Sequence, residues 1–315
     1  MVDVTILGGG AIAAACGDVL SRAGFSLRHG FELESSDRSP IILGEMPSTF
    51  TVARQVVESG RHLLVASPAN LSPERLSLLL DNRKRAQALF VWSERRYHPA
   101  YRFMNSLIEA DSTWQPRFLR QETLAVALPT SALVRWLTLE AVALVLGLAR
   151  EPGTSVMATC AINTTRNAPD LISLALTCAT LDAYIQVGLG EAVERRETLL
   201  ASADRKAYID ELNQSTPIRL IEDDRAARGG SSRWLACPSS TPDELARQQC
   251  LAFLHATLES QQALEEADLL LRSLSVFSAA EASLKRGAAV MVQAQNPEPR
   301  FHVVSSLRAN HPTVA

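Results

Sequence analysis

Three consecutive glycines, Gly8, Gly9 and Gly10, directly follow a short apolar run at residues 4–7. The run is typical of a buried parallel strand, and the small residues of 11–22 predict a helix that begins right after the glycines. A glycine turn between a strand and a helix lets the backbone approach a phosphate group, and the helix points its positive end at that group. The opening of the chain therefore predicts a nucleotide-binding α/β domain. A glycine turn without a ligand is the alternative.

The spacing of the glycines agrees with the dinucleotide pattern G-x-G-x-x-A, with Gly8, Gly10 and Ala13 at the three small positions. That pattern also expects an acidic residue about 20 positions further on, which holds the ribose hydroxyls. Glu32 and Glu34 lie in that range, but neither clearly ends a strand.

A short second strand at 25–27 would leave Arg28 and His29 at its tip. Arg28 could then meet a 2′-phosphate. A surface arginine in a shortened loop is the other interpretation.

The first half of the chain alternates between strands and helices. Apolar runs at 41–43, 62–65 and 88–92 each precede a helical pattern. This alternation predicts a doubly wound parallel sheet, which we assign to a Rossmann-like first domain, residues 1–113.

After Trp114 the pattern changes to longer strands and longer helices, which predicts a second, α+β domain over residues 114–294. Its expected elements are a long apolar helix at 134–148, strands that include 155–162 and 173–189, and a mostly helical segment at 241–287. The last stretch, 295–315, carries three prolines and little periodicity. We expect this tail to be partly disordered or draped over the surface.

The composition argues against several classes of protein. The chain has 315 residues, a net charge of −3 and only short basic clusters, so no large basic surface is available for nucleic acid. The five cysteines are scattered without a C-x-x-C pair, and the six histidines show no metal-ligand spacing, which predicts a reducing compartment and no metal. The longest uncharged apolar stretch, 141–149, is too short to cross a membrane. We expect a cytoplasmic protein.

Three stretches resemble the Gfo/Idh/MocA oxidoreductases. IILGEMPST at 41–49 resembles their strand and proline turn, VESGRHLLVASP at 57–68 resembles their x-x-x-G-K-H-V-x-x-E-K-P segment, and SERRYHPAY at 93–101 resembles their N-R-R-F-x-P stretch. Residues 241–290 resemble their C-terminal helices more loosely. The resemblance implies binding of NAD or NADP by the first domain. It also implies a second domain built on a large open, mainly antiparallel sheet, which caps a small-molecule substrate and forms a homodimer.

The chain departs from this family at the positions that carry its chemistry. Ser67 stands at the E-K-P lysine, which donates a proton or hydrogen bond near the reacting carbonyl, and a serine hydroxyl cannot supply that cationic acid. The helix that matches the family's Asp/His pair has no histidine, and Glu140 is its titratable group. Phe50 stands where a histidine often follows the proline turn.

The segment from Gly10 to Pro47 is also too short for the usual full βαβ unit plus strand. One helix and one strand are expected to be missing or shrunken, which would thin the wall around the adenosine half of a dinucleotide.

The glycine pattern and the resemblance together assign the candidate site. The predicted cofactor-binding residues are Gly8, Gly10, Ala11, Ile12, Glu45, Pro47, Ser67 and Arg95. Tyr97, His98 and Glu140 are the catalytic candidates, because the first two follow a strand end and an imidazole has a suitable unperturbed pKa. The alternative is that Tyr97 packs in the core and His98 caps the following helix.

These observations favour an NAD(P)-dependent oxidoreductase with non-standard acid-base residues, which acts on a small polar or reactive carbonyl or imine substrate. Two alternatives stay open. One is a non-catalytic relative that serves as a ligand sensor, scaffold or auxiliary subunit. The other is a non-redox enzyme, such as a cyclase or lyase, on the same fold.

Overall fold

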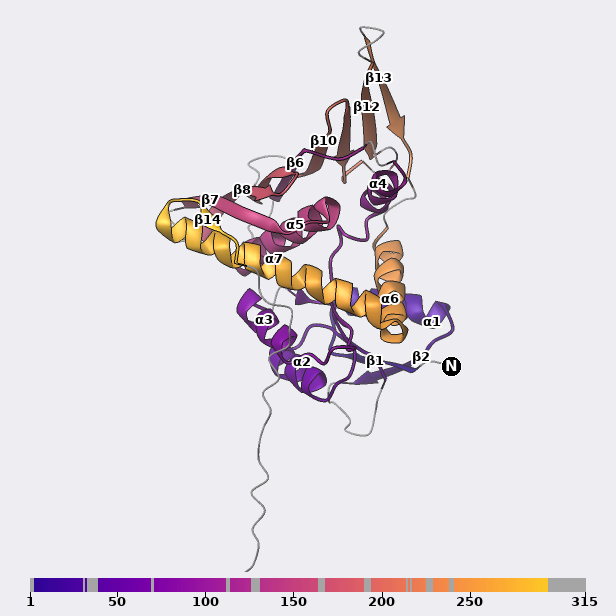
Figure 1. Cartoon of the computed structure of the whole chain (residues 1–315). Helices are drawn as coiled ribbons and strands as arrows, with labels where there is room; N and C mark the ends of the chain where they lie inside the picture. Colours follow the sequence, from indigo (N-terminus) through magenta and orange to yellow (C-terminus); the bar gives the residue numbers. More distant parts are fainter. Residues whose placement is uncertain are drawn as a thin grey trace, which may run out of the picture.

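The computed structural model has two layered parts joined along one long helix (Figure 1). It describes residues 3–30, 32, 39–68, 71–111, 114–125, 131–163, 168–189, 194–213, 215, 217–224, 229–237 and 241–293. The expected tail at 295–315 lies outside these residues.

The first part is a five-stranded parallel sheet with the order β2-β1-β3-β4-β5, as the alternation of strands and helices predicts. Its strands are β1 (Asp3–Leu7), β2 (Ser26–Gly30), β3 (Ile41–Leu43), β4 (Leu63–Val65) and β5 (Leu89–Val91). The helices that follow them are α1 (Ala11–Arg22), α2 (Thr49–Glu58), α3 (Pro73–Asp81) and α4 (Pro99–Ala110). Strands β3, β4 and β5 are buried along their whole length, which explains their continuous apolar sequences.

The sheet ends at β2, which pairs with β1 and leaves no further strand beyond it among the described residues. Residues 31–40 connect β2 to β3 on the other side of β1, and this segment is too short for a helix plus a strand. The expected loss of one helix and one strand is therefore confirmed for the described sheet.

The position of β2 corrects one expectation. The strand covers Ser26–Gly30 rather than 25–27, so Arg28 and His29 lie inside it and not at its tip. Their backbones pair with Thr5 and Ile6 of β1, which extends the strand to Gly30. Arg28 donates from Nη2 to Asp3 Oδ2 at 3.4 Å on the surface.

The second part is a nine-stranded, mainly antiparallel sheet with the order β13-β12-β11-β10-β6-β9-β8-β7-β14, in which β6 and β9 are parallel. Its strands are β6 (Phe118–Ala125), β7 (Gly153–Asn163), β8 (Ala168–Cys178), β9 (Asp182–Leu189), β10 (Arg195–Ala201), β11 (Arg205–Asp210), β12 (Ile218–Asp224), β13 (Gly229–Leu235) and β14 (Val290–Met291). The expected single strand at 173–189 is wrong: Cys178 N donates to Leu181 O at 2.8 Å and closes a turn between β8 and β9.

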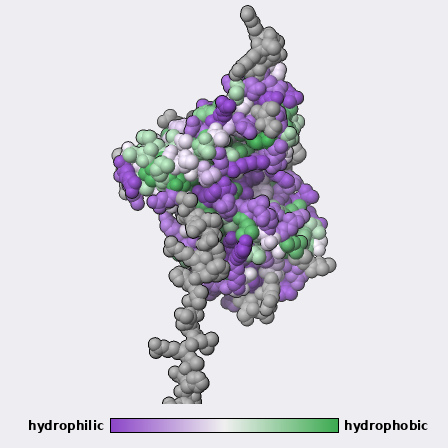
Figure 2. All heavy atoms as spheres, in the orientation of Figure 1, coloured by the Kyte–Doolittle hydropathy of each residue, from purple (hydrophilic) through white to green (hydrophobic). Residues whose placement is uncertain are grey.

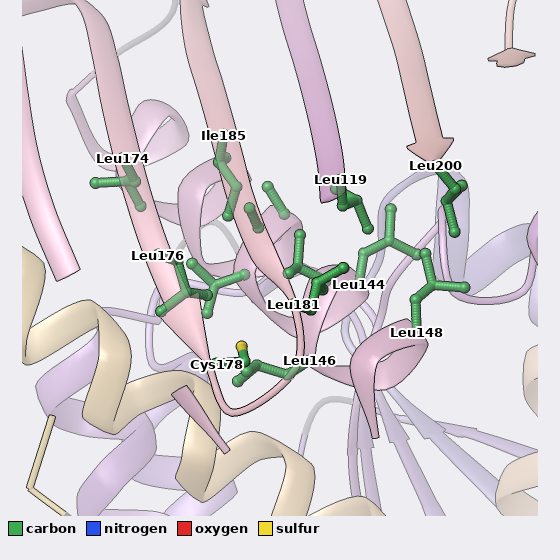
Figure 3. Packing of buried hydrophobic residues seen from close by; sticks show 14 of the residues in the cluster. Leu119, Leu144, Leu146, Leu148, Leu174, Leu176, Cys178, Leu181, Ile185 and Leu200 are labelled. Carbon is green, nitrogen blue, oxygen red and sulfur yellow. The ribbon is translucent and has the colours of Figure 1, made fainter. Parts of the chain in front are cut away.

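Three helices join the two parts: α5 (Ser131–Ala149), α6 (Pro242–Leu258) and α7 (Ser260–Arg286). Leucines of α5 pack under the nine-stranded sheet against residues such as Leu174 and Leu176 (Figure 3). Helix α7 contributes to this core and also to the core on one face of the five-stranded sheet, together with α2 and α3. Helix α6 covers the opposite face beside α1. Both parts therefore share their hydrophobic cores with C-terminal helices.

No helix in the described part of the chain is long and apolar enough to span a membrane. The described residues also contain no group of three or more His, Cys, Asp or Glu side chains that could hold a metal ion.

The packing of α6 on the five-stranded sheet predicts that the C-terminal helices stabilise the first domain. The rings of Phe253 and Phe90 meet edge to face, with centroids 5.6 Å apart, and both side chains are fully buried. Phe253→Ala should lower the free energy of unfolding by about 3–5 kcal/mol, because it leaves a cavity in this core. Urea unfolding measures the change. Leu258→Ala, at a side chain that is 82% exposed on the same helix, is the control and should change it little.

Candidate functional site

The glycine turn lies at the carboxyl end of β1 and is held by its own backbone. Gly9 N donates to Glu45 O at 3.0 Å, and Glu45 N donates to Gly9 O at 2.7 Å. This contact requires glycine at Gly44 as well, because a Cβ there would lie 2.2 Å from Gly9 O. Gly8 and Gly10 have φ values of 83° and 96°, which L side chains rarely adopt. The turns after β1 and β3 therefore fit together backbone to backbone.

Helix α1 begins at this turn with an open N-terminus. Gly10 is the N-cap and offers no side-chain hydrogen bond, and the first turn of the helix carries no acidic residue. The backbone N–H groups there, including those of Ala11 and Ile12, have no intrahelical acceptor. They give the turn a positive electrostatic potential that favours an anion.

Glu45 lies directly against this turn. A Cβ on Gly10 would stand 2.9 Å from Glu45 Cδ and 3.1 Å from Glu45 Oε1. Ser67 Oγ, at the carboxyl end of β4, donates to the same Oε1 at 3.3 Å. The structure thus brings Gly10, Glu45 and Ser67 together from the ends of three neighbouring strands, as the sequence predicts for parallel strands.

Two clefts flank Glu45. The α2 cleft has a volume of about 600 Å³ and is lined by residues 45–51 and Arg75, which include Glu45 and Pro47. The α1 cleft has a volume of about 610 Å³ and runs from the glycine turn along the seam between α1 and β2. Glu45 lines the first, and Gly10, which it touches, lines the second.

The α1 cleft lies where the missing crossover helix would pack. Right-handed crossovers that continue in one direction place successive helices on one face of a sheet, so a helix after β2 would lie beside α1. In its absence, Phe25, Leu27 and His29 line the cleft opposite α1. A Cβ on Gly17 of α1 would stand 3.5 Å from His29 Cε1, which is ordinary van der Waals distance, so His29 lies directly beside this helix.

The carboxyl end of β5 is tied to the second domain. Ser93 Oγ donates to Glu140 Oε1 at 2.8 Å, and Ser93 N donates to Gln249 Oε1 at 3.1 Å. Arg95 Nε lies 3.4 Å from Glu211 Oε1 with both side chains buried. Residues from α5, α6 and the β11–β12 turn therefore fill this strand end, and Arg95 lies inside the protein rather than at a cleft.

Burial and charge shape the titration of this cluster. Burial raises the pKa of Glu140, although Arg95 and the Ser93 hydrogen bond partly offset it. Burial disfavours the Arg95 cation, but the carboxylates of Glu211 and Glu140 outweigh this and raise the pKa of Arg95. The attraction between the buried Arg95 and Glu211 side chains therefore offsets the cost of removing their charges from water.

The two candidates that follow β5 pack inside the molecule. His98 Nδ1 accepts from Ala100 N at 3.2 Å and caps α4, and burial lowers the pKa of this imidazole. Tyr97 packs against the core that α1 and α6 share, and burial raises the pKa of its hydroxyl. Tyr97, His98 and Glu140 line neither of the two clefts. This placement agrees with the alternative in which Tyr97 packs against the core and His98 caps the following helix. A catalytic role for the three residues stays a prediction.

A buried polar chain beside Arg95 was not predicted from the sequence. Tyr101 Oη donates to Glu211 Oε1 at 2.6 Å and lies 2.7 Å from Thr198 Oγ1. These residues come from α4, β10 and the β11–β12 turn. The signal that could have found Thr198 is its place in a strand whose alternate positions face the core.

No protein-family model and no curated protein matches this chain. Solved structures do. UDP-N-acetylglucosamine 3-dehydrogenase GnnA from Acidithiobacillus ferrooxidans is 19% identical, with a TM-score of 0.70 over 90% of this chain and 99% of that one. An NAD binding oxidoreductase from Klebsiella pneumoniae is 12% identical, with a TM-score of 0.77 over 93% and 100%. Levoglucosan dehydrogenase in complex with NADH is 11% identical, with a TM-score of 0.72 over 93% and 99%.

The chain has the fold of the Gfo/Idh/MocA-type oxidoreductases. One solved structure with this fold, levoglucosan dehydrogenase, is in complex with NADH. In this chain a Cβ on Gly8 would stand 2.8 Å from Glu45 O, so this glycine serves the contact between the two turns. Glu45 is the side chain that lies against Gly10. The uncapped first turn of α1 would suit an anionic group, whereas an acidic side chain, Glu45, lies at the same place.

The buried cap at His98 predicts a pH-dependent stability. Because the pKa of His98 is lowered in the folded protein, the unfolded chain binds more protons as the pH falls below about 6.5, and stability is lost there. His98→Asn keeps a capping acceptor but cannot titrate. Its loss of stability between about pH 7.5 and about pH 5.5 should be smaller than that of the wild type, by at most about 1.4 kcal/mol per pH unit.

Urea unfolding at the two pH values measures this difference. His255→Asn, at an exposed histidine of α6, is the control for removal of an imidazole. Equal losses of stability in the wild type and His98→Asn would contradict the prediction.

Proposed function

We propose that this chain is a divergent oxidoreductase that binds NAD or NADP and acts on a small polar or reactive carbonyl or imine substrate. The observation that carries the proposal is the glycine turn itself. It opens α1 at the carboxyl end of β1, with its N–H groups free of a side-chain cap and a cleft on each side. Ligands of doubly wound sheets bind at this edge.

Different parts of the site would bind different parts of the dinucleotide. The N–H groups at Ala11 and Ile12 would hold the diphosphate, because they belong to the uncapped first turn of α1. The α1 cleft lies toward β2, the side on which the adenosine half would bind, and the α2 cleft would orient the nicotinamide and substrate beside Pro47. A bound nicotinamide supplies hydride transfer.

The acid-base chemistry of such a site is reduced. The Ser67 hydroxyl can donate a hydrogen bond to a substrate oxygen or nitrogen. It is too weak an acid to transfer its proton to the substrate at neutral pH. A substrate that is already reactive, such as an imine, needs only this polarisation. This argument supports a reactive substrate over an ordinary sugar alcohol.

Titration of the purified protein with NADH and NADPH, followed by nicotinamide fluorescence, tests the proposal. Gly10→Ala should abolish the binding, because its Cβ would fill the turn and press on Glu45. Gly24→Ala is the matched control: Gly24 also has a positive φ, of 84°, but a Cβ there meets nothing within 4 Å. Failure of both nucleotides to bind the wild type at millimolar concentration would rule out the reductase.

A non-catalytic, ligand-binding relative is the second candidate. It is favoured by the burial of His98 and Glu140 and the partial burial of Tyr97 away from the clefts, and by serine at position 67. In that case the two clefts would bind a small ligand without turnover.

We also propose a homodimer through the outer face of the nine-stranded sheet. On the face away from α5 and α7, a largely apolar row crosses six neighbouring strands in register: Met157, Ala175, Tyr184, Arg120, Leu199 and Tyr208. Hydrophobic residues gather at the β7 end of this sheet (Figure 2). Met157 is 45% exposed there. An exposed apolar face of this kind is typical of an association surface.

Light scattering after gel filtration measures the assembly. The wild type should have the mass of a dimer, and Ala175→Glu should shift it to the monomer, because its cross-strand neighbours, Met157 and Tyr184, offer a buried charge no partner. Leu258→Glu, on the exposed end of α6, should leave the dimer intact. A monomeric wild type would contradict the proposal.

A further inference from the structure

The Glu45 side chain occupies the place that the glycine turn leaves open. Gly10 has no Cβ, and the atoms that its Cβ would meet first are Cδ, Cγ and Oε1 of Glu45, at 2.9, 3.0 and 3.1 Å. A dinucleotide site keeps this glycine bare so that a diphosphate can approach the backbone. In this chain the group that approaches is the protein's own carboxylate.

Electrostatics favours this arrangement. The first turn of α1 has no acidic residue and no side-chain cap, so its positive end lacks a counter-charge from its own helix. The carboxylate of Glu45, from the turn after β3, lies against Gly10, the N-cap of this helix, and Ser67 Oγ donates to Glu45 Oε1 at 3.3 Å. A diphosphate at the same turn would meet a like charge at close range.

We propose that Glu45 is a built-in competitor of the cofactor diphosphate, which sets the affinity of the glycine turn by occupying it. The inference rests on the proposed binding of NAD or NADP. It adds a specificity-determining residue to that site: ligands with an anionic group at the turn must displace Glu45.

The structure provides a place for the displaced side chain. Glu45 also lines the α2 cleft, and Arg75 of α3 lines the same cleft. The backbone of Glu45 is held by two hydrogen bonds to Gly9, so the side chain can rotate toward Arg75 without loss of the turn. A Glu45 side chain displaced from Gly10 would therefore enter the α2 cleft, where Arg75 is the cation among the lining residues.

Two substitutions separate charge from size. Glu45→Gln keeps the size and removes the charge, and Glu45→Ser removes both, while the backbone hydrogen bonds to Gly9 remain. Calorimetric titration with inorganic pyrophosphate and fluorescence titration with NADH give the dissociation constants. Glu45→Gln should bind both ligands about fivefold more tightly than the wild type, and Glu45→Ser about tenfold or more.

The matched control is Glu58→Gln, which makes the same change of charge at an exposed glutamate in the last position of α2. It should change both dissociation constants by less than about twofold, because salt screens charges beyond about 10 Å. Thermal unfolding of all variants checks that each one is folded.

The outcomes distinguish the two proposals. Wild-type binding of NADH with less than about twofold change on either Glu45 substitution overturns the role of Glu45 and leaves the proposed function standing. Tighter pyrophosphate binding by the variants, with no NADH binding by any of them, supports the role of Glu45 and overturns the proposed function. Absence of binding of both ligands to every variant overturns both.

Arg75→Met tests the displaced position of Glu45. It should weaken NADH binding in the wild-type background, because the displaced carboxylate loses its partner, but not in the Glu45→Ser background. Equal weakening in both backgrounds would show that Arg75 contacts the ligand directly, and would overturn the displacement of Glu45 toward Arg75.

Discussion

The contact between two backbone turns organises the candidate site. The turn after β1 and the turn after β3 exchange hydrogen bonds between Gly9 and Glu45, and they approach so closely that Gly44 has no room for a side chain. This contact places Glu45 beside Gly10, the N-cap of α1. A side chain at Gly44 would collide with Gly9 O and break the contact, whereas a Cβ at Gly9 would meet nothing within 4 Å.

The two edges of the five-stranded sheet differ in what covers them. At the β2 edge, the missing helix and strand leave the α1 cleft open from the glycine turn to His29. At the other end, contacts from the second domain close β5: Gln249 and Glu140 bind Ser93, and Glu211 pairs with Arg95. The described sheet is therefore open beside α1 at its β2 edge and closed by buried polar contacts at the carboxyl end of β5.

The predicted catalytic residues make structural contacts in this fold. Tyr97 packs against a core, His98 caps α4 and Glu140 accepts from Ser93. In contrast, Glu45 lines the α2 cleft beside the turn and accepts from Ser67. This distribution supports the proposal that backbone N–H groups, more than acid-base side chains, would bind a ligand at the turn.

The sequence by itself determined the glycine turn, the buried strands, the missing unit before Ile41 and the absence of a lysine at Ser67, because each depends on residues close together in the chain. The tertiary structure decided what those features face. The register of β2 placed His29 beside α1, and the pairing of Arg95 with Glu211 joined positions far apart in sequence. The contact of Glu45 with Gly10 depends on β1 and β3, which become neighbours only when the sheet forms. A local sequence pattern therefore cannot predict this contact.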